Sequence, residues 1–135
     1  MWTHQESIEI AAEPERIWAL FSDVAGWPRW NSGIERIEIH GPFVTGTTFS
    51  MTVPGADTFT SQLLDVHENA SFIDETILDG TRVVVLHEIS PLPSGKSHVT
   101  YSTEITGPNE EEFGPMVTGD FGDVLKALKS LVEST

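Results

Sequence analysis

The polar and apolar positions of the chain follow two different periods, which predict helices near its two ends and strands between them. Residues 4–12 alternate around Ile8 and Ile10, as a half-buried strand does. A helix is predicted from Pro14, which suits a first helical turn, and a short helical turn at residues 27–31 follows a break at a glycine and a proline. The apolar face of the first helix consists of Ile17, Trp18, Leu20 and Phe21.

Six strand-like segments follow, and their short, turn-forming separators predict a sequential antiparallel meander. The Asp79-Gly80 pair is the sharpest hairpin signal, because a two-residue turn of type I′ needs residues that tolerate positive φ. With this pair as the loop, Asp74 faces Val85 across the hairpin. The six predicted strands span residues 34–40, 47–53, 59–66, 72–78, 82–89 and 99–106.

A long C-terminal helix is predicted from about Asn109 to Val132, because apolar residues recur there every three or four positions. Asn109 is a suitable N-cap, and the three glutamates after it favour the positive end of the helix dipole. Pro115 and three glycines disfavour a straight helix. Unless the helix starts later than predicted, it is kinked near Pro115. The glycines then indicate either a late or frayed helix start, or missing side chains that leave room for a ligand beneath the helix. The apolar stripe consists of Phe113, Val117, Phe121, Val124, Leu128 and Leu131.

This order of elements predicts an α+β fold in a single domain, residues 1–135. Seven antiparallel strands form a curved sheet that wraps around the long C-terminal helix and buries its apolar stripe, with two short helices after the first strand. A domain of this length buries roughly 68–70% of its unfolded surface, which suffices for a sizeable core.

One face of the predicted hairpin carries the candidate polar site residues. The opposite face has three charges, so this face is interpreted as the inward one. On it Asp74 and His87 are diagonal neighbours, which form either a satisfied polar pair or an acid–base pair facing a ligand. Tyr101, the only tyrosine, shares the inward face by alternation, and its hydroxyl bonds either a neighbour or a ligand. The inward hairpin residues are Phe72, Asp74, Thr76, Val83, Val85, His87 and Ile89.

The charge balance restricts the expected partners. Seven Lys and Arg stand against 21 Asp and Glu, for a formal charge of −14, which repels nucleic-acid phosphates and anionic membrane surfaces. The absence of cysteine excludes disulfides, thiolate catalysis and cysteine-ligated metals. No secretory signal is visible, and no apolar run approaches the roughly 18 residues of a membrane helix. A cytoplasmic location without membrane insertion is therefore expected.

No motif for a metal, a cofactor or a nucleotide is visible. The histidines lack ligand spacing of the HExxH kind. GxSxG, P-loop and GxGxxG stretches are absent, so neither a serine-hydrolase nor a nucleotide-dependent mechanism has support. We therefore expect no metal and no cofactor. The five histidines are His4, His40, His67, His87 and His98.

The order of elements and the stretch AEPERIWALFSDVAGWPRWNSGIERIEI resemble the START-like superfamily with the helix-grip fold, which includes Bet v 1-like proteins. The most similar group is the bacterial polyketide cyclase/dehydrase and lipid transport family, also called SRPBCC. The resemblance covers nearly the whole chain and rests on residues 12–30 and 95–108. These motifs are specific for fold and not for function, because such proteins include carriers, enzymes, receptors and co-chaperones.

The resemblance implies a deep cavity between the curved sheet and the C-terminal helix. Trp27 and Trp30 would lie near the mouth of this cavity, with Trp27 partly exposed. Alternatively, Trp30 would fill the core at that end of the fold. The position of His87 is often tryptophan in relatives, which implies a more polar cavity and a ligand with a hydrogen-bonding group. The expected ligand-binding residues are Trp27, Trp30, Phe49, Met51, Phe59, Phe72, Asp74, Val85, His87, Tyr101, Phe113, Val117 and Phe121.

Three functions follow from these observations. The first is a binding protein for a small hydrophobic or aromatic molecule, oriented by Asp74, His87 or Tyr101. The second is a polyketide cyclase/dehydrase-like enzyme that uses His87 and Asp74 as acid and base, with Tyr101 as a further catalytic candidate. The third is a protein-interaction module whose cavity is filled. In each case we expect a monomer or a homodimer.

Overall fold

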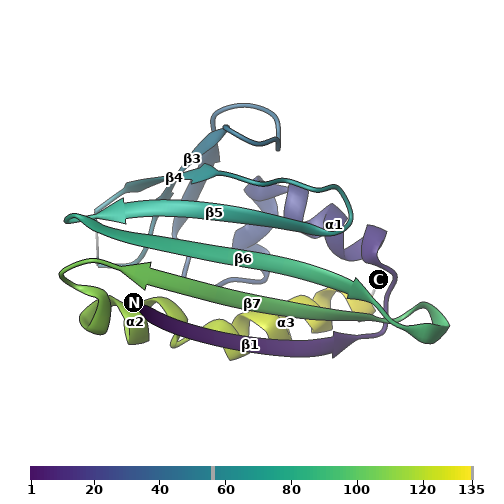
Figure 1. Ribbon diagram of the computed structural model, residues 1–135. Helices are drawn as coiled ribbons and strands as arrows, with labels where there is room; N and C mark the ends of the chain where they lie inside the picture. The colour runs from purple at the N-terminus through teal and green to yellow at the C-terminus, as the bar shows by residue number, and fades with distance from the viewer. Residues whose placement is uncertain (56, 135) are drawn as a thin grey trace.

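The computed structural model describes residues 1–55 and 57–134. In this part of the chain seven strands form one antiparallel sheet in the order β1-β7-β6-β5-β4-β3-β2 (Figure 1). The strands are β1 (Trp2–Ile10), β2 (Arg36–Ile39), β3 (Thr48–Thr52), β4 (Phe59–Leu63), β5 (Ser71–Leu78), β6 (Thr81–Pro91) and β7 (Ser97–Thr106). The helices are α1 (Pro14–Ser22), α2 (Glu110–Thr118) and α3 (Phe121–Glu133), with short 3₁₀ helices η1 (Val24–Arg29) and η2 (Pro93–Gly95).

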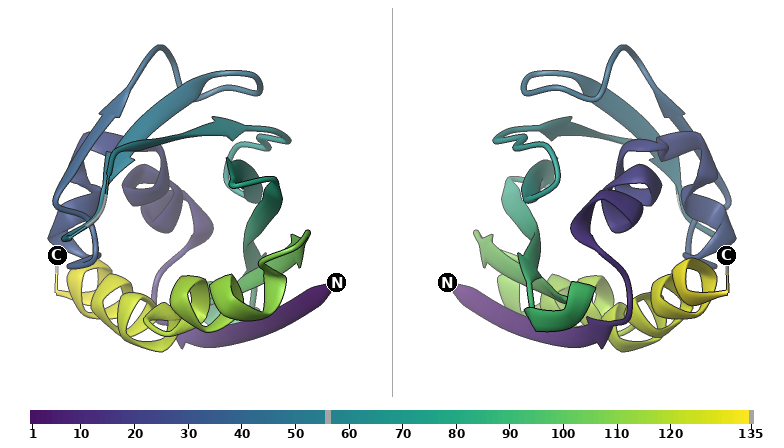
Figure 2. Two further views of the ribbon diagram at one scale, coloured as in Figure 1. Left: turned by 90° about the vertical axis from the view of Figure 1, so that its left-hand side faces the viewer. Right: turned by 90° about the vertical axis from the view of Figure 1, so that its right-hand side faces the viewer.

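The sheet is strongly curved, and α2 and α3 close its open side (Figure 2). The first strand pairs with the last one, while β2 to β7 follow one another as a meander. The predicted α+β architecture, with a seven-stranded sheet around a long C-terminal helical segment and two short helices after the first strand, is therefore confirmed. No helix in the described part of the chain is long and apolar enough to cross a membrane.

The β5–β6 hairpin has the predicted register. Leu78 pairs with Thr81, and Asp74 pairs with Val85. Asp79 and Gly80 have φ values of 51° and 77°, as the two central residues of a type I′ turn require. Burial alternates along β6, so the face predicted to point inward does so. The buried residues of β6 are Thr81, Val83, Val85, His87 and Ile89.

Several strand ends differ from the prediction because pairing with a neighbouring strand decides where a strand ends. β1 starts at Trp2, two residues earlier than expected, because it pairs with β7 over its whole length. The first pair joins Trp2 to Ile105. β6 likewise continues to Pro91, which pairs with Ser97 of β7. At the sheet edge, β2 is shorter than predicted and has only β3 beside it.

The C-terminal helix is interrupted at residues 119–120, which corrects the expected kink at Pro115. Pro115 lies inside α2, and its carbonyl accepts a hydrogen bond of 2.9 Å from the Gly119 amide. α3 begins at Phe121 after this break. Its buried stripe extends the predicted one by Leu125 and Val132; the set is Phe121, Val124, Leu125, Leu128 and Val132.

The helix glycines provide close packing against β1, so the interpretation that they leave room for a ligand is wrong. A Cβ on Gly114 would overlap the indole of Trp2, and a Cβ on Gly122 would lie 3.1 Å from Oε1 of Glu6. Both glycines therefore face β1. Gly114 lets α2 approach the strand so closely that the indole of Trp2 lies against the helix backbone.

The two tryptophans of η1 and its C-cap are core residues, and the expected exposure of Trp27 is wrong. Trp27 is 6% exposed and Trp30 is 5% exposed. The Trp27 indole donates a 2.9 Å hydrogen bond to the carbonyl of Phe21. Its ring stacks on Phe72 with centroids 5.9 Å apart and meets Phe49 edge-on at 5.4 Å. η1 also starts at Val24, three residues before the predicted turn.

We predict that Gly114→Ala destabilises the fold. Alanine favours a helix by roughly 1 kcal/mol over glycine, but overpacking against the Trp2 ring costs about 1–3 kcal/mol. Gly122→Ala is the matched control, because its Cβ meets only the mobile end of Glu6. Urea denaturation should show a net loss for Gly114→Ala and none for Gly122→Ala. Equal effects of the two substitutions would refute the proposed packing of Trp2 on α2.

Candidate functional site

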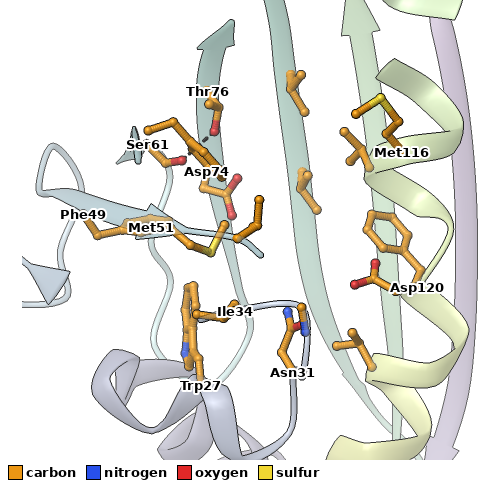
Figure 3. Close-up of a pocket in the computed structure, with 18 of the residues that line it drawn as sticks. Trp27, Asn31, Ile34, Phe49, Met51, Ser61, Asp74, Thr76, Met116 and Asp120 are labelled. Atoms are coloured by element: carbon orange, nitrogen blue, oxygen red, sulfur yellow. Dashed lines mark hydrogen bonds between the residues drawn. The ribbon is translucent and has the colours of Figure 1, made fainter. Parts of the chain in front are cut away.

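A cavity of about 560 Å³ lies between the inner face of the sheet, η1 and the C-terminal helices. Figure 3 shows Trp27, Ile34 and Met51 on one side of it and Met116 of α2 on the other. Most of its lining is apolar or aromatic. Of the residues predicted from the sequence, the cavity is lined by Trp27, Trp30, Phe49, Met51, Phe59, Phe72, Asp74, Val85, His87, Tyr101, Val117 and Phe121.

Phe113 is the one predicted ligand-binding residue that does not line the cavity. It is half-buried and packs against the hydrophobic core from α2. The prediction placed it in line with Val117 and Phe121 on one continuous helix. Val117 lies one turn further along α2 and does line the cavity, so the lining from α2 comes from the C-terminal part of that helix.

Three rings form one row across three strands on the inner face of the sheet. His87 of β6 pairs with Phe72 of β5 on one side and with Tyr101 of β7 on the other. The His87 imidazole stacks on Phe72 with ring centroids 4.0 Å apart and an interplanar angle of 8°. It meets the Tyr101 ring edge-on at 4.6 Å. This packing fixes the imidazole plane, since each ring blocks rotation of the next.

Asp74 and His87 are the diagonal neighbours that the register predicts. Nε2 of His87 lies 3.8 Å from Oδ2 of Asp74, which is too long for a direct hydrogen bond. Nδ1 of His87 lies 3.4 Å from the carbonyl oxygen of Phe72. With the Nδ1 proton directed to that carbonyl, Nε2 is left as an acceptor on the side of Asp74.

Burial shifts the pKa of these groups in opposite directions. It raises the pKa of the Asp74 carboxyl to about 7. It lowers the pKa of the His87 imidazole to about 3, against the opposing effect of the Phe72 carbonyl. The pKa of Tyr101 is raised by burial and then by the charges of Asp74 and Asp120. The site therefore holds a neutral imidazole beside a carboxyl that titrates near neutral pH.

Two buried polar atoms of the lining have no hydrogen-bond partner among the described residues. They are the hydroxyl oxygen of Tyr101 and Nε1 of Trp30, and both side chains are at most 5% exposed. By contrast, Ser61 and Thr76 satisfy each other through a bond of 2.5 Å. Unpartnered buried polar atoms cost about 1–3 kcal/mol, so a ligand that bonds them removes that cost.

Sequence reasoning missed the polar rim of the cavity. Asp120 points into the cavity from the junction of α2 and α3, opposite Asp74 of β5 (Figure 3). Asn31 also lines the cavity, and a Cβ on Gly33 would lie 3.0 Å from Oδ2 of Asp120. Helical spacing offered a signal for Asp120, because it follows Val117 by three positions and precedes Val124 by four. Asn31 and Gly33 lie in a loop, where no period indicates direction.

The arrangement supports hydrogen bonding, ion pairing and proton transfer. Tyr101 donates or accepts, neutral His87 accepts at Nε2, and Asp74 gives up or takes a proton near neutral pH. Among residues 1–55 and 57–134, no group of three His, Asp or Glu side chains is arranged to hold a metal ion.

The two shifted pKa values predict opposite pH dependences of stability. An unfolded Asp loses its proton near 3.8 but folded Asp74 keeps it to about 7, so this group lowers the stability of the fold as pH rises through that window. His87 has a depressed pKa, so its contribution is present above 6.5 and is lost as pH falls toward about 3. Between about pH 3.8 and about pH 6.5 the two trends largely cancel in the wild-type protein.

We predict that substitution separates these trends. From about pH 5.5 to about pH 8, Asp74→Asn should gain about 2 kcal/mol of unfolding free energy relative to wild type. His87→Phe should gain unfolding free energy relative to wild type as pH falls from about 7 to about 5. Urea titrations at several pH values measure both. Curves parallel to the wild-type curve would mean that the two pKa values are not shifted.

Solved structures share this fold at low sequence identity. Truncated norcoclaurine synthase from Thalictrum flavum has a TM-score of 0.78 at 22% identity, over 97% of this chain and 92% of the other. A START superfamily protein from Mycobacterium smegmatis has a TM-score of 0.77 at 20% identity, over 98% and 97%. A protein from Mesorhizobium loti reaches 0.81 at 18% identity, over 99% and 98%. These similarities show the fold alone.

Norcoclaurine synthase has also been solved in complex with dopamine and hydroxybenzaldehyde; that structure has a TM-score of 0.78 at 21% identity, over 98% of this chain and 87% of the other. A search of curated proteins finds no match. A family profile described as "Polyketide cyclase / dehydrase and lipid transport" matches residues 1–133. The profile spans both the cavity-forming sheet and the helices that cover it. The chain belongs to the polyketide cyclase/dehydrase and lipid transport family.

Proposed function

We propose that this protein binds a small, largely apolar aromatic molecule that carries a hydrogen-bonding group. The observation that carries the proposal is a cavity of about 560 Å³ with aromatic walls, whose lining residues include Tyr101, a side chain with a buried hydroxyl that has no partner among the described residues. Cavities of this size and composition are typical of small-molecule sites.

Both the apolar walls and the polar groups of the cavity contribute to the free energy of binding. Removing apolar ligand surface from water contributes roughly 25 cal/mol per Å². The aromatic side chains of Trp27 and Phe121 belong to this lining, and aromatic rings pack favourably against an aromatic ligand. Tyr101, His87 and Asp74 then fix the orientation of the ligand, because an orientation that leaves a buried polar group without a hydrogen bond is strongly disfavoured.

The family and its fold support this proposal in general terms. Norcoclaurine synthase, which has the same fold, holds two small aromatic compounds, dopamine and hydroxybenzaldehyde. A fold that holds such molecules is compatible with an aromatic ligand here. The third function predicted from the sequence, an interaction module, assumed a filled cavity; the open volume of about 560 Å³ removes that premise.

A second function, proton-transfer catalysis, is favoured by one observation. Asp74 has a pKa of about 7 and lies beside His87, which burial keeps neutral. A carboxylate with such a pKa is a stronger base than a surface carboxylate. It takes a proton from the carbon next to a ligand carbonyl, the C–H electrons form an enolate, and the Tyr101 hydroxyl donates a hydrogen bond to the enolate oxygen.

We predict that the neutral fluorescent dye 1-aminoanthracene binds in the cavity. Val85→Trp should weaken its binding at least about tenfold, because a large side chain then occupies the site. Val84→Trp is the matched control: it changes the neighbouring residue of the same strand, which does not line the cavity. Fluorescence titration measures both affinities. If the dye never binds, or binds the Val85→Trp variant as well as wild type, the binding proposal fails.

The catalytic alternative has its own test. Deuterium exchange at the α carbon of 2-tetralone, followed by NMR in D₂O, reports proton abstraction. We expect the protein to accelerate exchange, with a rate that rises with pH and levels off above about 7 as Asp74 ionises. Asp74→Asn should abolish the acceleration, and Asp65→Asn, outside the cavity, should leave it unchanged. Equal exchange with wild type and Asp74→Asn would exclude catalysis by Asp74 and leave the binding proposal intact.

A further inference from the structure

The charged residues of the cavity lining are of one sign. Four carboxylates line it, and the described lining contains no Lys and no Arg. Asp74 lies deep inside, while the other three are exposed at the rim. The four carboxylates are Asp57, Asp74, Asp79 and Asp120. An anionic ligand such as a carboxylic acid would meet only like charge along this path.

Among residues 1–55 and 57–134, the deep carboxylate of Asp74 forms no ion pair with a Lys or Arg side chain. The nearest basic group is Nε2 of His87 at 3.8 Å, and burial keeps the pKa of that imidazole near 3. Asp74 therefore faces the cavity without a counter-charge when it ionises above about pH 7. A buried carboxylate without a partner is costly, so a cation placed there is strongly favoured.

A second observation concerns Tyr101, which belongs to the same lining as the carboxylates. The hydroxyl of this side chain is buried and has no partner in the described part of the chain. Burial raises the pKa of this phenol most, and the charges of Asp74 and Asp120 raise it further, so both carboxylates act on the same region. A donor group in that region can bond Tyr101 and a carboxylate at once.

The walls around this region are also suited to a cation. Trp27, Trp30 and Tyr101 contribute ring surfaces to the lining, and the electron-rich faces of such rings attract ammonium groups in desolvated sites. Aromatic faces combined with carboxylates bind amines, whereas a fatty acid site needs a basic or neutral donor at the carboxylate end.

We propose that the ligand of this cavity is an aromatic amine that binds as a cation, its ammonium group bonded by Asp74 and the Tyr101 hydroxyl, with Asp120 at the rim attracting the same charge. The inference rests on the proposed binding function and narrows it to one chemical class.

The test compares three ligands of the same shape at about pH 8, where Asp74 is ionised. They are 2-(1-naphthyl)ethylamine, 2-(1-naphthyl)ethanol and 1-naphthylacetic acid, titrated by calorimetry. We expect the amine to bind roughly 10-fold or more tightly than the alcohol, and the acid most weakly. Asp74→Asn should bring the amine to within about threefold of the alcohol. Asp120→Asn should have a smaller effect, because that group is exposed.

The control is Asp65→Asn, which removes the same unit of charge from an exposed position outside the cavity. It should leave the amine preference unchanged, so a general effect of net charge is separated from the cavity carboxylates. Proton release gives an independent measurement. Near pH 6.5, binding of the amine should release protons as Asp74 ionises, and binding of the alcohol should not.

Three results would overturn the inference. If the amine and the alcohol bind wild type equally, or the acid binds most tightly, the cavity does not select cations, and the proposed binding function stands. If the amine preference survives in Asp74→Asn, Asp74 is not its source. If 1-aminoanthracene binds the cavity but none of the three ligands does, the amine class is wrong. Absence of binding by the dye as well would remove the proposed function itself.

Discussion

The pairing of β5 with β6 is the constraint on which the site depends. The turn at Asp79-Gly80 adopts two positive φ angles, and a shift by one residue would turn every side chain of the hairpin to the opposite face. The observed register instead brings Phe72, His87 and Tyr101 into one row. The same register places Asp74 diagonally beside His87, inside a wall that is mostly apolar.

The helices decide that this wall bounds a cavity and not a filled core. α2 lies against β1 through the contact of Gly114 with Trp2, and α3 begins after a break at residues 119–120. The large side chains of α3 pack into the core, whereas the junction directs Asp120 toward the sheet (Figure 3). Close packing at β1 thus accompanies an open space on the other side of the same helical segment.

The polar groups in that space carry a cost that the free protein does not offset. Among the described residues, Tyr101 and Trp30 each keep a buried polar atom without a partner, and burial opposes the charge of Asp74. Buried polar groups that lower the stability of the free protein are expected at a binding site. They are consistent with a site organised for a ligand that supplies hydrogen bonds, and with a carboxyl group whose proton is exchanged near neutral pH.

The sequence by itself determined the fold class and the inward face of the hairpin, and all but one of the expected ligand-binding residues line the cavity. Turn chemistry and the two periods of apolar residues are local properties that a single chain displays directly. Tertiary structure alone decided the burial of Trp27, the exclusion of Phe113 from the cavity and the absence of a partner for Tyr101. These outcomes depend on the distance between helix and sheet, which is set by contacts such as that of Trp2 with Gly114, from opposite ends of the chain.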